Sequence, residues 1–432
     1  MVDNEALTGA FLLYTQYMKR RVSELLRWSE KYTQTDMVYL AKGGFWLVAG
    51  QAGAAITAFV FSILVANFLP QEAFGSYRYI SSLISIVGAI SLSGLGITII
   101  RKVARGDDMA LRRGFARTIQ WSLPMMFCFF VVAAYYAYQG NYIFALAVLV
   151  GGLAMPFING ASLFNAYWNG KKDFKKQTLY WTGANVITTG CIGIAILLTD
   201  HITTLVSVFF VASAVSNLIF YWLTVKNVPK TPYKKDEEEA RDGLHQSIIN
   251  FLMMLSGQID KIIVFQLMGP AQLAIYTFAV AIPEQLRGTA KTFARITLPR
   301  FAEQSIDHIR ASIGNKIWRF ALIASLLAIG YGVLAYPLFT FVFPQYLESI
   351  PYTIALSFLI VGGIGAAPLS ALQAHARHKE LYIHAIVSSA LQVISTVVLI
   401  WYYGLWGAVT ALIFNRIIVP FFLPWFLLKK EK

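Results

Sequence analysis

Long apolar runs separated by short polar segments make up most of this chain. An α-helix rises 1.5 Å per residue, so a run of about 20 apolar residues spans the roughly 30 Å hydrocarbon core of a bilayer. The pattern predicts an all-α polytopic membrane protein. Its twelve predicted membrane helices lie near residues 44–68, 79–100, 119–138, 142–168, 179–198, 202–225, 244–268, 272–298, 317–336, 351–373, 381–402 and 405–428.

The longest polar stretch inside the chain divides these twelve helices into six and six. It covers 226–243 and is typical of a cytoplasmic linker, with its proline residues and its run of charges. We therefore expect an N-terminal lobe over 44–225 and a C-terminal lobe over 244–432, arranged around a central cavity. Residues 1–43 are predicted to form a cytoplasmic amphipathic segment, which either lies on an anionic membrane surface or packs against the helices.

The two halves share a weak repeat. At an offset of 199 residues, 65–77 (VANFLPQEAFGSY) lies over 264–276 (VFQLMGPAQLAIY), and Tyr77 matches Tyr276. Each half begins and ends on the same side of the membrane. A parallel repeat of this kind is typical of transporters whose substrate site lies between the halves.

Composition and charge placement identify the class of protein. Hydrophobic residues make up 57% of the chain and charged residues 13%, where soluble domains have about 25% charged residues. The net charge of +14 does not indicate a nucleic-acid partner, because the Lys and Arg residues lie in alternate short loops. The intervening loops hold none apart from Arg78. By the positive-inside rule both termini are expected in the cytoplasm, with the protein in the cytoplasmic (inner) membrane.

Three cations lie four residues apart inside the predicted helix 272–298: Arg287, Lys291 and Arg295. At 100° per residue they drift only about 80° around the helix while rising roughly 12 Å, which makes one positive stripe. Each such charge costs about 2.5 to 3.5 kcal/mol at the centre of a membrane, so we expect the stripe to face a wet cavity or a partner charge. An anion or an anionic head group is the expected cargo. Arg295 has a second interpretation, snorkelling to the cytoplasmic surface.

Carboxylates accompany these cations. Glu284 precedes Arg287 by one turn, which predicts a local ion pair. Asp260 and Lys261 point about 100° apart, so we do not expect them to pair; Asp260 is expected to meet Arg287 or Lys291 across the helical hairpin. Asp260 is also the candidate for coupling to Na⁺ or H⁺. The alternative for all of these groups is a set of structural ion pairs.

Three further polar residues are candidates. Arg416 lies near the middle of the last predicted helix, Asn250 lies in 244–268, and Arg78 lies at the outer end of the second helix, where it guides a leaving anion or anchors the interface. The chain has no G-x-x-x-x-G-K-[ST] motif and no cluster of metal-ligating residues. We therefore expect a membrane transporter without a cofactor rather than an enzyme.

Several of these residues carry a resemblance to a known family. The motifs are L-P-x-x-x-F-G-x-Y at 69–77, Gly-Leu-Gly at 94–96 followed by Arg101, and Q-I-D-K-I-I-V-F-Q-L-M-G-P at 258–270 with L-P-R-F at 298–301. Over residues 40–428 the chain resembles the polysaccharide transport branch of the multidrug/oligosaccharidyl-lipid/polysaccharide exporter (MOP) superfamily. That branch includes Wzx-type O-antigen flippases.

The resemblance implies a function. Such proteins move an undecaprenyl-diphosphate-linked oligosaccharide, the repeat unit of a surface polysaccharide, from the cytoplasmic to the outer leaflet. The diphosphate would then bind Arg287 and Lys291, with Arg295 and Arg416 as further ligands, and a glycan polymerase and glycosyltransferases would be partners. Three alternatives stay open: a flippase for a peptidoglycan precursor or another lipid-linked glycan, a cation-coupled multidrug exporter, and a membrane scaffold that recruits glycosyltransferases.

Overall fold

The computed structural model describes residues 37–91, 94–226, 228, 238–296, 306–363 and 378–420, and within these ranges every regular element is helical. The helices are α2 (Met37–Phe68), α3 (Gln71–Gly88), α4 (Leu95–Ala104), α5 (Ala110–Gln120), α6 (Ser122–Tyr138), α7 (Tyr142–Ala161), α8 (Leu163–Gly170), α9 (Phe174–Leu198), α10 (Ile202–Val225), α11 (Glu238–Met268), α12 (Pro270–Ile296), α14 (Ile306–Val342), η1 (Pro344–Ser349), α15 (Ile350–Leu356), α16 (Leu359–Gly362), α18 (His378–Ile413) and η3 (Phe414–Ile418). Each of the twelve predicted spans overlaps at least one of them. The all-α membrane class is confirmed, and eight helices of the described part are long and apolar enough to cross a membrane.

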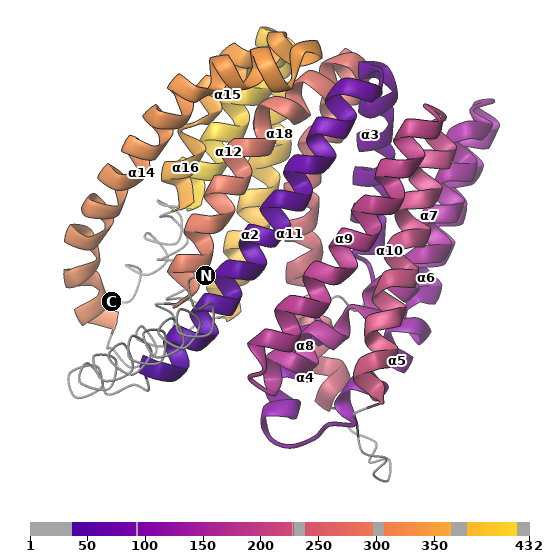
Figure 1. Cartoon of the computed structure of the whole chain (residues 1–432), viewed down its shortest axis with the longest axis vertical. Coiled ribbons are helices and arrows are strands. Elements are labelled where there is room, and N and C mark those ends of the chain that lie inside the picture. Colours follow the sequence, from indigo (N-terminus) through magenta and orange to yellow (C-terminus); the bar gives the residue numbers. More distant parts are fainter. Residues whose placement is uncertain are drawn as a thin grey trace, which may run out of the picture.

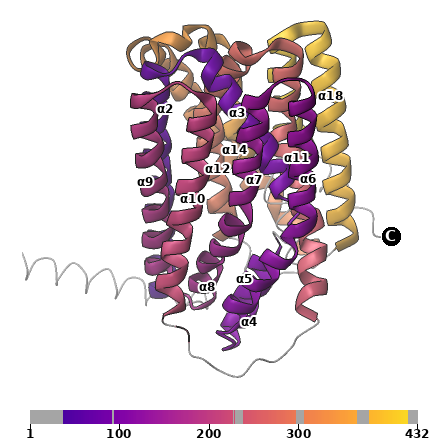
Figure 2. The same ribbon diagram turned by 90° about the vertical axis from the view of Figure 1, so that its right-hand side faces the viewer.

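The helices pack as two bundles (Figure 1). In the N-terminal bundle α10 packs on α7 and α9, α2 packs on α9, and α6 packs on α7, while the short α4, α5 and α8 lie together at one end (Figure 2). In the C-terminal bundle α11 packs on α18, and α12 and α14 both pack on α15 and α16. The long apolar helices thus bury their contact faces against each other and leave large hydrophobic side chains on the outside, as lipid-facing surfaces require.

Helix α3 connects the two bundles, because it packs on α11 and α12 as well as on α7 and α10. The approach of α3 to α12 is so close that a Cβ atom at Gly75 would lie 1.9 Å from the carbonyl oxygen of Pro270. Only glycine fits at that position without movement of the backbone.

Aromatic rings close the bundles against each other at the end where α3 and α12 begin, the upper end in Figure 1. The ring centroids of Phe74 and Phe278 are 5.4 Å apart, and Phe278 stacks on Tyr346 at 3.7 Å. The side-chain amide of Gln71 donates to the carbonyl of Gln345 across the same junction. The two bundles are therefore joined at this end by packing and by hydrogen bonds.

Two predicted boundaries need correction. The span expected at 79–100 is two helices, since α3 begins at Gln71 and ends at Gly88, and α4 follows from Leu95. The basic segment 101–118, expected as a loop, is mostly helical because α4 and α5 continue through it, and α5 and α6 together form the span Ala110–Tyr138. Hydropathy averages over a window and does not detect a break of a few residues.

The last two spans form a hairpin inside α18. The chain reverses at Gly404, whose φ of +54° is in the left-handed region that favours glycine. The N-terminal segment up to residue 36 and most of the predicted linker lie outside the described residues, so the proposed domain boundaries stay predictions.

Candidate functional site

Six charged side chains from four elements gather where the two bundles meet, and we call them the charged cluster. Helix α3 contributes one residue, α11 and α12 two each, and η3 one. Mutual electrostatic interactions connect them. The members are Arg78, Asp260, Lys261, Glu284, Arg287 and Arg416.

Asp260 is the buried acid of the charged cluster, with 2% of its surface exposed. It accepts a hydrogen bond of 2.8 Å from the Tyr276 hydroxyl and one of 3.4 Å from Nζ of Lys261, which also donates to the carbonyl of Gly257 at 3.0 Å. The prediction that Asp260 and Lys261 do not pair is therefore wrong. A lysine side chain is long enough to curl back along its own helix, so the angle between Cβ directions does not decide which atoms meet.

Arg287 carries its own counter-ion. Its Nε donates to Glu284 at 2.8 Å, and Nη2 donates to the second carboxylate oxygen, which confirms the predicted pair. Only 2% of the Arg287 surface is exposed, so of the two expected environments, a wet cavity or a partner charge, Arg287 has the partner charge. Asp260 makes its hydrogen bonds to Tyr276 and Lys261 rather than to Arg287.

Arg78 lies inside α3, two turns from its start, and not at the outer end of a span as predicted. It lines a cavity of about 350 Å³ together with Ser82 and Gln258, whose side chains hydrogen-bond at 3.1 Å across the two bundles. Arg78 interacts electrostatically with Asp260. Its Nε is buried and has no hydrogen-bond partner among the described residues. Arg78 therefore presents an unsatisfied donor next to a cavity.

Arg416 lies on the π-helix η3. π-Helical turns are rare and are frequent at functional sites. A Cβ atom at Gly257 would lie 3.8 Å from Nη2 of Arg416, so the guanidinium lies one turn from Asp260 and Lys261 on α11. Its Nε is also buried without a partner in the described part of the chain. The approach of α16 at Gly362 to the Arg416 carbonyl holds this turn in place.

The remaining candidates lie elsewhere. Asn250 is half-buried on α11, ten residues before Asp260 and thus roughly 15 Å along the helix. Lys291 and Arg295 belong to α12, and their side chains lie outside the described residues. The structure therefore brings six of the nine predicted residues together.

The charged cluster is positive overall. Four cations and two carboxylates leave a net charge of +2. Charges interact strongly where water is scarce, and buried ionic groups require partners. An anion with two negative charges would balance this site.

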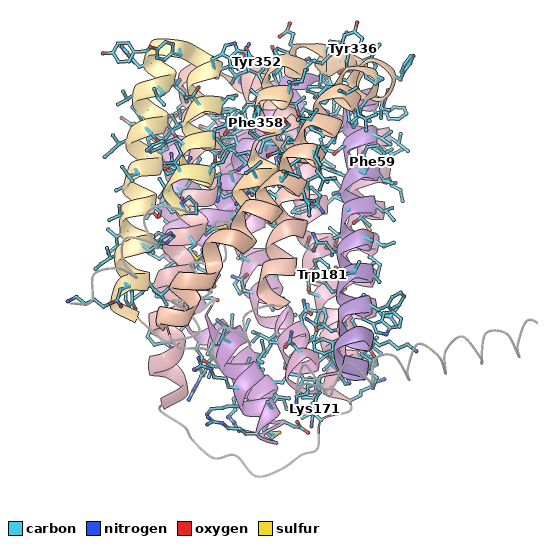
Figure 3. All side chains as sticks on the ribbon, turned by 90° about the vertical axis from the view of Figure 1, so that its left-hand side faces the viewer. Phe59, Lys171, Trp181, Tyr336, Tyr352 and Phe358 are labelled. Carbon is cyan, nitrogen blue, oxygen red and sulfur yellow. The ribbon has the colours of Figure 1, made fainter. Side chains whose placement is uncertain are left out.

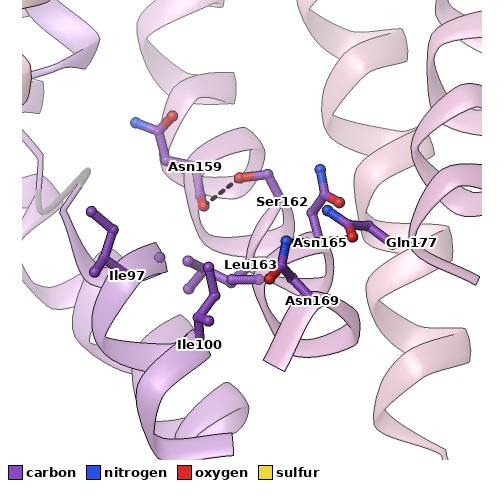
Figure 4. A pocket seen from close by; sticks show the side chains of 10 residues that line it. Ile97, Ile100, Asn159, Ser162, Leu163, Asn165, Asn169 and Gln177 are labelled. Atoms are coloured by element: carbon purple, nitrogen blue, oxygen red, sulfur yellow. Dashed lines mark hydrogen bonds between the residues drawn. The ribbon is translucent and has the colours of Figure 1, made fainter. Parts of the chain in front are cut away.

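Sequence reasoning missed the neutral cavities beside the charged cluster. Two further cavities, of about 280 Å³ and 370 Å³, lie within the N-terminal bundle and are lined mainly by amides, hydroxyls and apolar groups (Figure 4). A signal was present on α9, where Gln177, Trp181, Asn185 and Thr189 recur at intervals of four residues along one helix face.

Comparison with known proteins identifies the family. The model of a family described as "Polysaccharide biosynthesis protein" matches residues 40–305, more than half of the chain. The chain belongs to this family. No curated protein matches the sequence.

Solved structures show the same fold. An inward-facing multidrug-resistance transporter of the MATE family, from the MOP superfamily, is 16% identical with a TM-score of 0.63, and the match covers 86% of this chain and 94% of that one. The lipid II flippase MurJ, in an inward closed conformation, is 13% identical with a TM-score of 0.65 over 90% and 87% of the two chains. A Pyrococcus furiosus MOP transporter, described as having a binding pocket of reverse polarity, is 15% identical with a TM-score of 0.59 over 91% and 96%. This multi-pass membrane protein therefore has the fold of the MOP transporters.

Proposed function

We propose that the protein is a flippase that moves an undecaprenyl-diphosphate-linked oligosaccharide from the cytoplasmic to the outer leaflet by alternating access. The observation that carries the proposal is the net-positive charged cluster, half-buried to buried where the two bundles of a transporter fold meet. Membership of a polysaccharide biosynthesis family supports a lipid-linked glycan as cargo. In this role the protein is a transporter and needs no catalytic residue.

The diphosphate would bind first to the cations that have unsatisfied donors. Arg78 and Arg416 each have a buried Nε without a described partner, and they flank the Asp260 and Lys261 pair. Guanidinium groups suit phosphate because their N–H donors form paired hydrogen bonds. Arg287 joins the site when the phosphate displaces Glu284. Lys291 and Arg295, one and two turns after Arg287 on α12, are proposed as further ligands.

The cycle we propose depends on sidedness. With both termini in the cytoplasm and the protein in the inner membrane, the joined end of the bundles faces outward. An inside-negative potential then favours outward movement of the diphosphate by about 2.3 kcal/mol per charge per 100 mV. We further propose that Asp260 couples the return of the empty carrier to Na⁺ or H⁺.

Proteoliposomes test the proposed function. A fluorescent undecaprenyl-diphosphate trisaccharide is incorporated, and the fraction accessible to a membrane-impermeant quencher is followed with time. We expect Arg78→Ala and Arg416→Ala to slow flipping at least about tenfold, while Arg105→Ala, which removes an exposed arginine, leaves it unchanged. Equal rates in all three variants would contradict a role for the charged cluster.

A second candidate is a flippase for a peptidoglycan precursor, favoured by the fold shared with the lipid II flippase MurJ. Assays with each lipid-linked glycan separate the two, since both cargoes carry a lipid diphosphate. A cationic drug is disfavoured as cargo because the charged cluster is already positive. If the protein were instead a scaffold that recruits glycosyltransferases or a glycan polymerase, its function would not require Arg78 or Arg416.

A further inference from the structure

Three adjacent cavities follow one another from the bundle interface, where Gln258 lines the first, into the N-terminal bundle, and we call this row the track. The cavity beside Arg78 shares Trp181, Asn185 and Thr189 with the second cavity, and the second shares Ser162 and Asn165 with the third. Their volumes are about 350, 280 and 370 Å³, each near the lower size of small-molecule sites. The track thus leads from the charged cluster into the N-terminal bundle.

Helix α9 defines the direction of this track. Gln177 lines the cavity farthest from Arg78. The two cavities nearer to Arg78 are both lined by Trp181, Asn185 and Thr189. From Gln177 to Thr189 the helix rises roughly 18 Å. Figure 3 shows Trp181 in the half of the molecule nearer to Lys171, away from the joined end of the bundles, where Tyr336 and Tyr352 lie.

The chemistry of the track is neutral. Of the described residues that line the three cavities, Arg78 alone is charged. The others supply amides, hydroxyls, aromatic rings and aliphatic groups. In Figure 4 the amides of Asn165, Asn169 and Gln177 gather on one side of the far cavity, with Ile97 and Ile100 on the other. An amide both donates and accepts hydrogen bonds, as a sugar hydroxyl does.

One amide of the track lacks a partner. Oδ1 of Asn165 is buried and makes no hydrogen bond to a described residue, although it lines both the second and the third cavities. A buried polar atom left without a partner costs about 1–3 kcal/mol, so a hydroxyl group in the cavity would relieve it. Asn169, in contrast, already donates to Gln177 at 3.4 Å.

We infer that this track binds the oligosaccharide of the cargo, and that it selects neutral sugars. The inference rests on the proposed function, since the diphosphate at Arg78 places the first sugar next to Trp181 and Asn185. The following sugars extend toward Asn165 and Gln177. A sugar carboxylate would be buried there without a cation to pair with, which is unfavourable.

Binding to the full-length protein in phosphatidylcholine nanodiscs tests the inference. Three probes are compared: undecaprenyl diphosphate alone, the same lipid carrying a neutral trisaccharide, and the same lipid carrying a trisaccharide with one uronic acid. We expect the neutral glycolipid to bind at least about tenfold more tightly than the bare lipid diphosphate, and the acidic one to lose most of that gain.

Variants locate the site. Asn185→Ala, Asn165→Ala and Trp181→Phe should each weaken binding of the neutral glycolipid about three- to tenfold, as loss of one hydrogen bond does, and leave the bare lipid diphosphate unaffected. Gln120→Ala, an exposed amide outside the track, is the matched control. Trp181→Phe keeps an aromatic ring and removes only the indole N–H and part of the bulk. It therefore remains informative if Asn165→Ala fails to fold.

The outcomes separate the two proposals. If the bare and glycosylated lipids bind equally well to the wild-type protein, or if the variants weaken both alike, the sugar track is refuted while the flippase proposal stands. Equal binding of the acidic and neutral glycolipids refutes the selectivity. If no lipid diphosphate binds, the proposed function fails, and the inference fails with it.

Discussion

At the scale of single residues, the pair of Asp260 and Lys261 shows how the charged cluster is balanced. The side chains are 3% and 11% exposed, and Asp260 lies near Arg78 as well. Removing one partner of a buried ion pair leaves an uncompensated charge, at a cost of about 3–5 kcal/mol. The Asp260 carboxylate therefore allows Lys261, Arg78 and Arg416 to approach each other.

Asp260→Asn should lower the thermal unfolding temperature in detergent strongly, because Lys261 then has no charged partner. The double variant Asp260→Asn/Lys261→Met should regain much of the loss, since a methionine replaces the buried ammonium with an apolar group of similar length. Unfolding is followed by size-exclusion chromatography after heating. A double variant no more stable than the single one would refute the pairing as the source of stability.

Glu284 offers a second test at this scale. Its carboxylate holds two nitrogens of Arg287, and 38% of its side chain is exposed. Glu284→Gln removes the competing charge, so undecaprenyl diphosphate should bind about tenfold more tightly, while flipping slows because release is harder. Glu348→Gln, which lies away from the charged cluster, serves as control. Weaker binding in Glu284→Gln would show that the carboxylate supports the site rather than competing with the phosphate.

Charged residues in apolar surroundings can be identified from the sequence, because placing a charge in a membrane costs free energy and so indicates a partner or a wet cavity. Their partners were not predictable to the same degree. The Glu284 and Arg287 pair follows from helical spacing, whereas the bond from Tyr276 to Asp260 depends on how α11 turns into α12. The spacing of four residues between the polar side chains of α9 is a weaker signal than a charge, since uncharged polar residues are common in membrane helices.

At the scale of helices, the junction of α3 and α12 depends on Gly75. An added methyl group would meet the backbone of Pro270, which cannot rotate away as a side chain can. Overpacking of this kind costs about 1–3 kcal/mol. Gly75→Ala should therefore lower the unfolding temperature although alanine is the better helix former.

Gly190→Ala is the matched control on α9, because a methyl group there meets nothing within 4 Å. It should leave stability unchanged or raise it by up to about 1 kcal/mol through helix propensity. If both substitutions act alike, the close approach of α3 and α12 is not what limits position 75.

Helix existence was predictable here and helix interruption was not. Each span predicted from hydropathy overlaps a helix, because crossing a bilayer requires about 20 apolar residues in a row. The break after Gly88 covers only a few residues, and the reversal at Gly404 depends on the backbone conformation of one residue, so a window average registers neither.

At the scale of the whole molecule, the weak repeat corresponds to matching contacts. Tyr77 packs on Phe61 with ring centroids 6.3 Å apart, and at the equivalent positions Tyr276 donates to Asp260. Phe61 and Asp260 occupy equivalent positions at the offset of 199 residues, as Tyr77 and Tyr276 do. The C-terminal half has a carboxylate where the N-terminal half has an aromatic ring, in line with five of the six members of the charged cluster lying on C-terminal helices.

Alternating access requires the joined end of the bundles to open. Gln71 and Gln345 touch across that end, so cysteines at these positions should react with a short, reducible bis-thiol crosslinker after Cys128 and Cys191 are replaced by serine. We expect the crosslinked protein to bind the lipid-linked trisaccharide normally but to lose flipping, and reduction to restore it. A crosslink within the N-terminal bundle, between Ile143→Cys and Thr203→Cys, should leave flipping intact.

The two crosslinks together decide how the cargo crosses. If the carrier moves its bundles apart, only the crosslink between bundles blocks flipping, because α3 and η1 must separate for the diphosphate to leave the charged cluster on the other side. Should flipping continue with Gln71→Cys and Gln345→Cys crosslinked to completion, the end that they join stays shut throughout transport. The cargo would then have to leave laterally between helices, with its sugars passing the lipid-facing surface, and the alternating-access proposal would be refuted.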